Sequence, residues 1–265
     1  MPADSMTAGR PTQLITCAAA LLLCTLSRAD EKVDALPGGK APSSAAEAAI
    51  AKLDLPGVKI NLAERCVDVE AKICLEEGTL ELVACIKGTK EHESIVVVDA
   101  KAMHIHTALL LLGAKPGKPA HRLQITDGEP SGRWVDVPPA GAKVAVSLLL
   151  TKEGGERVER KIGDFIKRLG AEGGEDGASF PESSFLFAGS ILADAPAGAR
   201  RRYMADDSGN LVSISTFGDE TLCLPGVHAH TNEQLLWEVD GTHTPPLGTK
   251  VTLRLRPEGK RSPDK

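Results

Sequence analysis

The chain has 265 residues, of which 42% are hydrophobic and 25% are charged, a composition that can fill one sizeable globular core. Its formal net charge of −5 argues against a protein that holds nucleic acid through phosphate contacts. Aromatic residues make up only 3% of the chain, which leaves little material for a platform that stacks bases or sugars. We therefore expect no nucleic-acid partner.

Residues 1–29 have the pattern of a secretory signal peptide. Residues 14–26 (LITCAAALLLCTL) form an apolar run, and Ser27 and Ala29 place small side chains just before Asp30. This pattern predicts cleavage after Ala29 and export to the periplasm or the cell exterior. The apolar run is too short to span a bilayer comfortably. An uncleaved leader that anchors the chain in the membrane is the alternative.

Two segments lack the composition of a folded core. Residues 30–55 are rich in Pro, Gly, Ser and Ala, which predicts a flexible tether. Residues 258–265 (EGKRSPDK) are almost entirely polar, which predicts a disordered tail. The folded domain is therefore expected to span residues 56–257.

A period-two pattern at the start of this domain predicts strands. In residues 66–75 (CVDVEAKICL), apolar side chains alternate with Asp68, Glu70 and Lys72, as in a strand with one wet face. The alternation resumes after the turn-forming residues 76–78, so residues 66–87 are predicted to form a β-hairpin. Further strands are predicted at residues 95–98, 144–151, 157–162, 185–192, 201–205, 211–217, 235–239 and 251–256.

Residues 100–112 (AKAMHIHTALLLL) interrupt this pattern and predict a helix. The segment contains no internal Gly or Pro and is followed directly by Gly113, as is usual at a helix C-terminus. We expect it to pack on the sheet through Met103, Leu109 and Leu110. A second helical turn is predicted at residues 164–169. The predicted fold class is α+β, mainly antiparallel β, sandwich- or barrel-like, with one substantial helix near residues 100–112.

Four segments carry a resemblance to a known family. They are KEHESIVVVDAKAMHIHTALLLLGAKPGKP at 90–119, FLFAGS at 185–190, ADDSGNLVSISTF at 205–217 and GTKVTLRLRP at 248–257. In this order they resemble the YdjY-domain family of exported bacterial proteins, over about residues 56–257. The resemblance implies an exported, β-rich domain and brings with it no substrate and no catalytic residue.

The cysteines of the expected mature chain are Cys66, Cys74, Cys85 and Cys223. They contain no C-x-x-C pair, which argues against an iron–sulfur cluster. In an exported protein they can pair in three ways that the sequence does not distinguish, or they can be small buried thiols. The hairpin register expected for residues 66–87 would place Cys74 and Cys85 too far apart to pair with each other.

Several catalytic and nucleotide-binding motifs are incomplete or missing. His92 and Glu93 begin an H-E-x-x-H zinc motif, but Val96 occupies the position of the second histidine. The GAKPGKP segment at 113–119 ends in proline where a phosphate-binding loop needs Ser or Thr. G-x-S-x-G and G-x-G-x-x-G are both absent from the sequence. We therefore expect no nucleotide or dinucleotide cofactor.

The candidate functional residues are Glu91, His92, Glu93 and Ser94. His92 could transfer protons between the two carboxylates, or it could bind a metal, with His228 and His230 as further candidate ligands. The interpretation that we favour is structural: His92 anchors the entry of a buried strand by hydrogen-bonding backbone groups, so that His92→Ala should cost stability.

These observations predict an exported binding or interaction module for a protein or small-molecule ligand outside the cytoplasm. The alternative is a metal-dependent or histidine-assisted enzyme centred on Glu91, His92, Glu93 and Ser94. An enzyme should bring further polar groups to His92 in a pocket, whereas a binding module should present an open face or a sheet edge.

Overall fold

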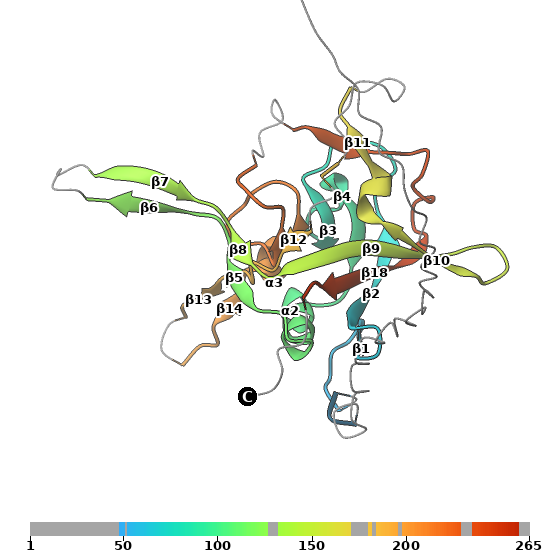
Figure 1. Ribbon diagram of the computed structural model, residues 1–265, viewed down its shortest axis with the longest axis horizontal. Helices are drawn as coiled ribbons and strands as arrows, with labels where there is room; N and C mark the ends of the chain where they lie inside the picture. Colours follow the sequence, from blue (N-terminus) through green and yellow to red (C-terminus); the bar gives the residue numbers. More distant parts are fainter. Residues whose placement is uncertain are drawn as a thin grey trace, which may run out of the picture. The chain divides into compact units, whose positions relative to one another are not determined.

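A sheet of 10 strands dominates the part of the chain that the computed structural model describes (Figure 1). The described residues are 48–50, 52–126, 132–170, 180–181, 184–195, 198–228 and 235–259. The predicted signal peptide, most of the tether, most of the tail and His230 lie outside these ranges. The strands of the sheet are β1 (Val58–Asn61), β2 (Cys66–Ile73), β3 (Leu82–Ile86), β4 (Ser94–Val98), β9 (Lys143–Thr151), β10 (Arg157–Lys161), β12 (Phe185–Leu186), β15 (Asn210–Ser213), β16 (Leu222–Cys223) and β18 (Lys250–Pro257).

The large sheet closes on itself. Its strand order is β1-β2-β18-β9-β12-β16-β15-β3-β4, and β4 also pairs with β2, while β10 pairs with β9. Closure leaves fewer unpaired edges that could recruit another chain. The β3–β4 and β15–β16 pairs are parallel, and the remaining pairs of this sheet are antiparallel. The predicted fold class, mainly antiparallel and barrel-like with one substantial helix, is confirmed.

Strand β2 shows how the period-two pattern builds the core. Val67, Val69, Ala71 and Ile73 are buried, whereas the intervening side chains on the second half of the strand are exposed. The second half of β2 pairs with β4 and the first half pairs with β1. The buried side chains belong to one hydrophobic cluster that also contains the four buried phenylalanines Phe165, Phe180, Phe185 and Phe187.

The predicted hairpin at residues 66–87 is wrong. β2 and β3 do not pair with each other; β4 lies between them, antiparallel to β2 and parallel to β3. The physical reason is that residues 95–98 are apolar and are buried or half-buried on both faces of the strand. A strand that is apolar on both faces needs hydrogen-bonding neighbours on both edges, and β2 and β3 provide them.

The main helix, α2 (Ala102–Leu111), forms where it was predicted, but it packs through different residues. Its buried side chains are Ala102, Ile105, Ala108 and Leu109. Met103 and Leu110 are 38% and 44% exposed, so the prediction that these two side chains pack on the sheet is wrong. Small alanine side chains let the helix backbone approach the sheet closely, and that face therefore becomes the buried one. A short helix, α3, spans Met204–Ser208.

The second predicted helical turn is also wrong. Residues 164–169 are divided between a 3-10 turn at Ile162–Phe165 and strand β11 (Ile166–Arg168), which pairs with β17 (Trp237–Val239). The buried side chains of Phe165 and Ile166 are adjacent in sequence, which suits a turn that leads into a strand better than one face of a helix.

Besides β11–β17, three more two-stranded units lie outside the large sheet in the described part of the chain, and most of their strands were not predicted. They are β5 (Pro116–Lys118) with β8 (Ala140–Gly141), β6 (His121–Ile125) with β7 (Arg133–Val137), and β13 (Leu192–Ala193) with β14 (Arg202–Tyr203). In Figure 1, β6 and β7 extend away from the large sheet. Their side chains are exposed or only half-buried, so they lack the one-sided burial that makes a strand recognisable in sequence. Among the described residues, no helix is long and apolar enough to cross a membrane.

Candidate functional site

The KEHES segment forms the connection between β3 and β4. Residues Glu91–Glu93 make one 3-10 turn. The His92 side chain is 78% exposed, and its Nε2 lies 3.7 Å from Glu93 Oε2. The interpretation of His92 as a buried anchor is therefore wrong. Ser94 has that role instead, because its fully buried hydroxyl donates to the Lys90 carbonyl at 2.7 Å.

The charged groups of this segment also pair with neighbours other than His92. Glu91 Oε1 accepts the Gly88 N–H at 2.5 Å. Lys90 Nζ lies 3.1 Å from Glu93 Oε1 and 3.7 Å from the centre of the Phe217 ring. These contacts place one cation on an aromatic face beside a carboxylate. They bring Glu91, Glu93 and Ser94 together as parts of a tight turn and leave His92 at its surface.

The structure changes the account of the cysteines. Cys74 follows β2 and Cys85 lies in β3, on opposite sides of β4, and the Cys74 thiol donates to the Ser94 carbonyl at 3.1 Å. The four cysteines in the described ranges are free thiols, and three of them are buried. Burial, helped by the neighbouring Asp68 carboxylate, raises the pKa of Cys66 to about 11, and burial together with Glu220 raises that of Cys223 to about 12.

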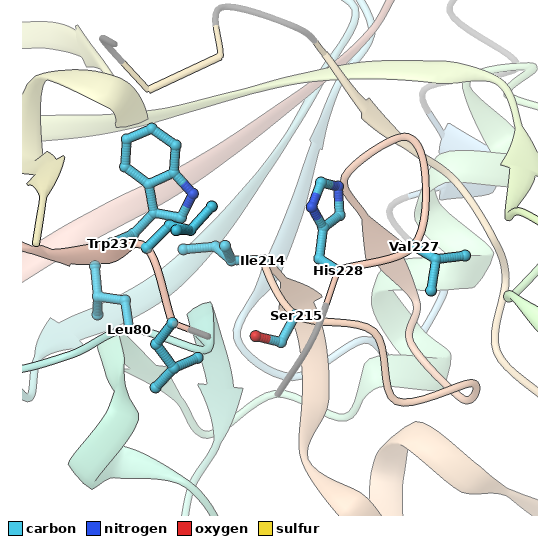
Figure 2. Close-up of a pocket in the computed structure, with 8 residues that line it drawn as sticks. Leu80, Ile214, Ser215, Val227, His228 and Trp237 are labelled. Atoms are coloured by element: carbon cyan, nitrogen blue, oxygen red, sulfur yellow. The ribbon is translucent and has the colours of Figure 1, made fainter. Parts of the chain in front are cut away.

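A cavity of about 240 Å³ opens near the end of β15 (Figure 2). Its walls come from four separate stretches of the chain, and most of the lining residues are apolar. The lining residues are Leu80, Ile214, Ser215, Val227, His228, Leu235, Leu236 and Trp237.

Backbone hydrogen bonds fix the walls of this cavity. The Leu80 N–H donates to the Trp237 carbonyl at 2.9 Å, and the Ser215 N–H donates to the Glu81 carbonyl at 2.9 Å. The His228 N–H donates to the Thr216 hydroxyl at 2.8 Å. The polar side chains in the lining are those of Ser215 and His228, and Figure 2 shows them on the same side of the cavity, across from Trp237.

His228 is held in one tautomer by its surroundings. Its Nε2 lies 2.8 Å from the Pro225 carbonyl oxygen, and because a carbonyl only accepts hydrogen bonds, the proton must be on Nε2. The metal-ligand hypothesis for His228 gains nothing from this contact, which occupies one of the two ring nitrogens. In the ranges that the structure describes, no group of three or more His, Cys, Asp or Glu side chains could hold a metal ion.

A second polar group lies between α2 and the segment around residue 189. His106 Nδ1 is 2.8 Å from the Tyr203 hydroxyl, which donates to the Gly189 carbonyl at 3.0 Å. The Tyr203 hydroxyl therefore accepts a hydrogen bond from the His106 Nδ1–H, and burial lowers the pKa of His106. A neutral, half-buried histidine in this position ties the helix to the neighbouring segment.

Sequence reasoning missed the cavity entirely. Leu80, Ile214 and Trp237 are ordinary apolar residues far apart in sequence, and neither spacing nor charge marks them. The one signal was His228, which was singled out as a metal ligand instead of a cavity wall.

The fold and the cavity define a β-rich protein whose closed sheet presents an apolar pocket. The chain belongs to the YdjY domain family, whose family model matches residues 58–256. This match confirms the resemblance found in the sequence. No curated protein and no solved structure matches the chain significantly.

Proposed function

We propose that the protein is an exported binding protein that takes a small, largely apolar ligand carrying one hydrogen-bonding group into the cavity beside Trp237. The observation that carries the proposal is the lining of that cavity, in which six apolar side chains accompany Ser215 and His228. Ligand pockets are typically apolar with a few placed polar groups, and barrel mouths are a common location for them.

The size and chemistry of the cavity define the ligand class. Its volume of about 240 Å³ is below the roughly 300–1,000 Å³ of pockets for drug-sized ligands, so the ligand is small. The Trp237 ring and the leucines provide an apolar wall. His228 and Ser215 provide the groups that would orient a hydroxyl, carbonyl or amide.

The alternative of an enzyme centred on Glu91, His92, Glu93 and Ser94 has less support. The His92 side chain is exposed, and its ion-pair contact is with the adjacent Glu93. Catalytic groups instead converge around a concave site. Export itself remains a proposal that rests on the pattern of residues 1–29.

Trp237 provides a local reporter for ligand binding. The chain contains only two tryptophans, Trp134 and Trp237, so Trp134→Phe leaves the cavity tryptophan as the single indole emitter. Titration with the apolar dye anilinonaphthalene sulfonate should quench this emission by energy transfer. In the same background, Leu236→Asp should weaken dye binding by about tenfold or more, because the carboxylate interrupts the apolar wall and repels the sulfonate of the dye.

Leu192→Asp is the matched control. Leu236 and Leu192 are 47% and 42% exposed, but only Leu236 lines the cavity. Dye that binds both variants with equal affinity, or that leaves Trp237 emission unchanged in the parent, would contradict the proposal.

A further inference from the structure

The His228 residue in the cavity wall is fixed at its backbone and at its ring. The His228 N–H donates to the Thr216 hydroxyl at 2.8 Å, and the Thr216 N–H donates to the His228 carbonyl at 3.0 Å. The ring Nε2–H donates to the Pro225 carbonyl at 2.8 Å. A side chain held in this way loses little conformational freedom when a ligand binds to it.

The other ring nitrogen of His228, Nδ1, is a hydrogen-bond acceptor. A neutral imidazole has one proton, and because that proton is on Nε2, Nδ1 carries a lone pair and can only accept. None of the residues that the structure describes donates a hydrogen bond to it. In Figure 2 the ring presents one nitrogen toward the side of Ile214 and Trp237 and the other toward the loop that carries Val227. The cavity is therefore lined by an acceptor that a ligand can pair.

The second polar side chain of the lining, Ser215, does not select between donors and acceptors. Ser215 is almost fully buried, and its hydroxyl forms no hydrogen bond with another residue in the described ranges. A hydroxyl can either donate or accept, so Ser215 can pair with a carbonyl, an ether or a hydroxyl of the ligand. Selection between these groups therefore falls to His228.

Burial of the lining residues indicates how a ligand is oriented. Leu80 and Ile214 are buried, whereas Val227 and Leu236 are exposed. The first two residues form the floor of the cavity and the other two form its rim, while His228 is half-buried. The apolar end of the ligand therefore enters toward the floor, and its polar group stays beside His228.

We propose that the ligand carries a hydrogen-bond donor, a hydroxyl or an N–H group, and donates it to His228 Nδ1. This inference rests on the proposed function and narrows the ligand class to small apolar alcohols, phenols and amines or amides with an N–H. A ligand whose only polar group is a ketone or ether oxygen would cover Nδ1 without pairing it. An acceptor that is buried and left unpaired weakens binding.

Two isomers that differ in one group test the donor requirement. The compounds para-ethylphenol and para-methylanisole contain the same atoms and have similar shapes, but only the phenol has an O–H donor. At about pH 8 a phenol keeps its proton and an imidazole is neutral. Each compound is titrated into the full chain carrying Trp134→Phe, and the emission of Trp237 is followed with excitation at wavelengths where both compounds absorb little.

We expect para-ethylphenol to bind about tenfold or more tightly than para-methylanisole. His228→Leu removes the acceptor, so the ratio of the two affinities should fall to about one. Ser215→Ala should weaken the binding of both compounds and preserve the ratio, because its hydroxyl can pair with either oxygen.

The donor requirement and the proposed function fail in different ways. Equal affinities of the two compounds in the Trp134→Phe chain, or a ratio that persists in His228→Leu, would overturn the donor requirement and leave the ligand proposal standing. If neither compound changes the emission of Trp237, the ligand proposal is overturned and the donor requirement falls with it.

Discussion

Replacing Arg254 with alanine should destabilise the protein more than removing any surface charge. Arg254 is only 6% exposed and lies opposite Asp68, across the β18–β2 pair. Its Nε and Nη2 donate to the two oxygens of Asp68 at 2.7 Å and 2.8 Å, a bidentate geometry. Its Nη1 also reaches Glu64 at 2.6 Å and Glu159 at 3.1 Å.

The magnitude follows from the burial of the partner that remains. The Asp68 side chain is 12% exposed, so Arg254→Ala leaves a nearly buried carboxylate without its main counter-charge. Breaking a buried pair in this way costs about 3–5 kcal/mol, whereas a surface pair contributes about 0–1 kcal/mol. The loss should lower the Tm by about 10 °C.

Urea unfolding followed by circular dichroism measures the free energy of unfolding, and two further variants make the result specific. Arg256→Ala is the matched control, because Arg256 is two positions along the same strand, is 38% exposed and pairs with Glu159; we expect it to cost about 0–1 kcal/mol. The double variant Arg254→Met with Asp68→Leu should recover most of the loss, because an apolar pair needs no counter-charge. Equal, small losses for Arg254→Ala and Arg256→Ala would refute the reasoning.

Three other predictions follow from the same structure and sequence. Mass spectrometry of exported material should find a chain beginning at Asp30, and an intact Met1 would contradict the predicted leader. His92→Ala should change the free energy of unfolding by less than about 0.5 kcal/mol, whereas Ser94→Ala should cost about 1–2 kcal/mol; urea unfolding of both variants distinguishes the two positions. Burial raises the pKa of Glu159, but hydrogen bonds from neighbouring arginines and Ser147 outweigh it and lower the pKa from 4.5 to about 2. Because the folded state favours the ionised form, the contribution of Glu159 to the free energy of unfolding should be present above about pH 4.5 and lost as the pH falls towards 2. Glu159→Gln should therefore flatten the dependence of the free energy of unfolding on pH in this range.

The sequence predicted those elements that follow from local pattern. Alternation along residues 66–73 marks β2, and the continuous apolar run at 95–98 marks β4, because burial on one face or on both leaves a direct trace in the residue types. The helix at 100–112 was located by its composition and by Gly113. Which side of that helix packs was mispredicted, because Leu110 and Ala108 can be distinguished only when the opposing surface is known.

Pairing between strands was harder to predict than the strands themselves. Two strands that follow each other closely form a hairpin in most folds, and nothing in residues 74–81 reveals that β4 inserts between β2 and β3. That single topological error also placed Cys74 and Cys85 on neighbouring strands, whereas β4 lies between those strands. The cavity beside Trp237 was unpredictable for a related reason, since its walls meet only after the sheet has closed.

The topology also explains why the KEHES segment resembles a site. β3 and β4 are parallel neighbours joined by residues 87–93 alone, whereas parallel strands usually need a connection of about a dozen residues or more. A connection this short must satisfy its own polar groups within the turn. Glu91 and Ser94 do so through the Gly88 N–H and the Lys90 carbonyl.

The short connection between β3 and β4 also constrains Gly209, which is distant in sequence. The Thr89 hydroxyl donates to the Ile86 carbonyl, and a Cβ added at Gly209 would lie 2.0 Å from the Thr89 hydroxyl oxygen. Gly209 also has a φ of +82°, a conformation that favours glycine. The clustered polar residues of KEHES and the glycine of ADDSGN are therefore requirements of one short parallel crossover.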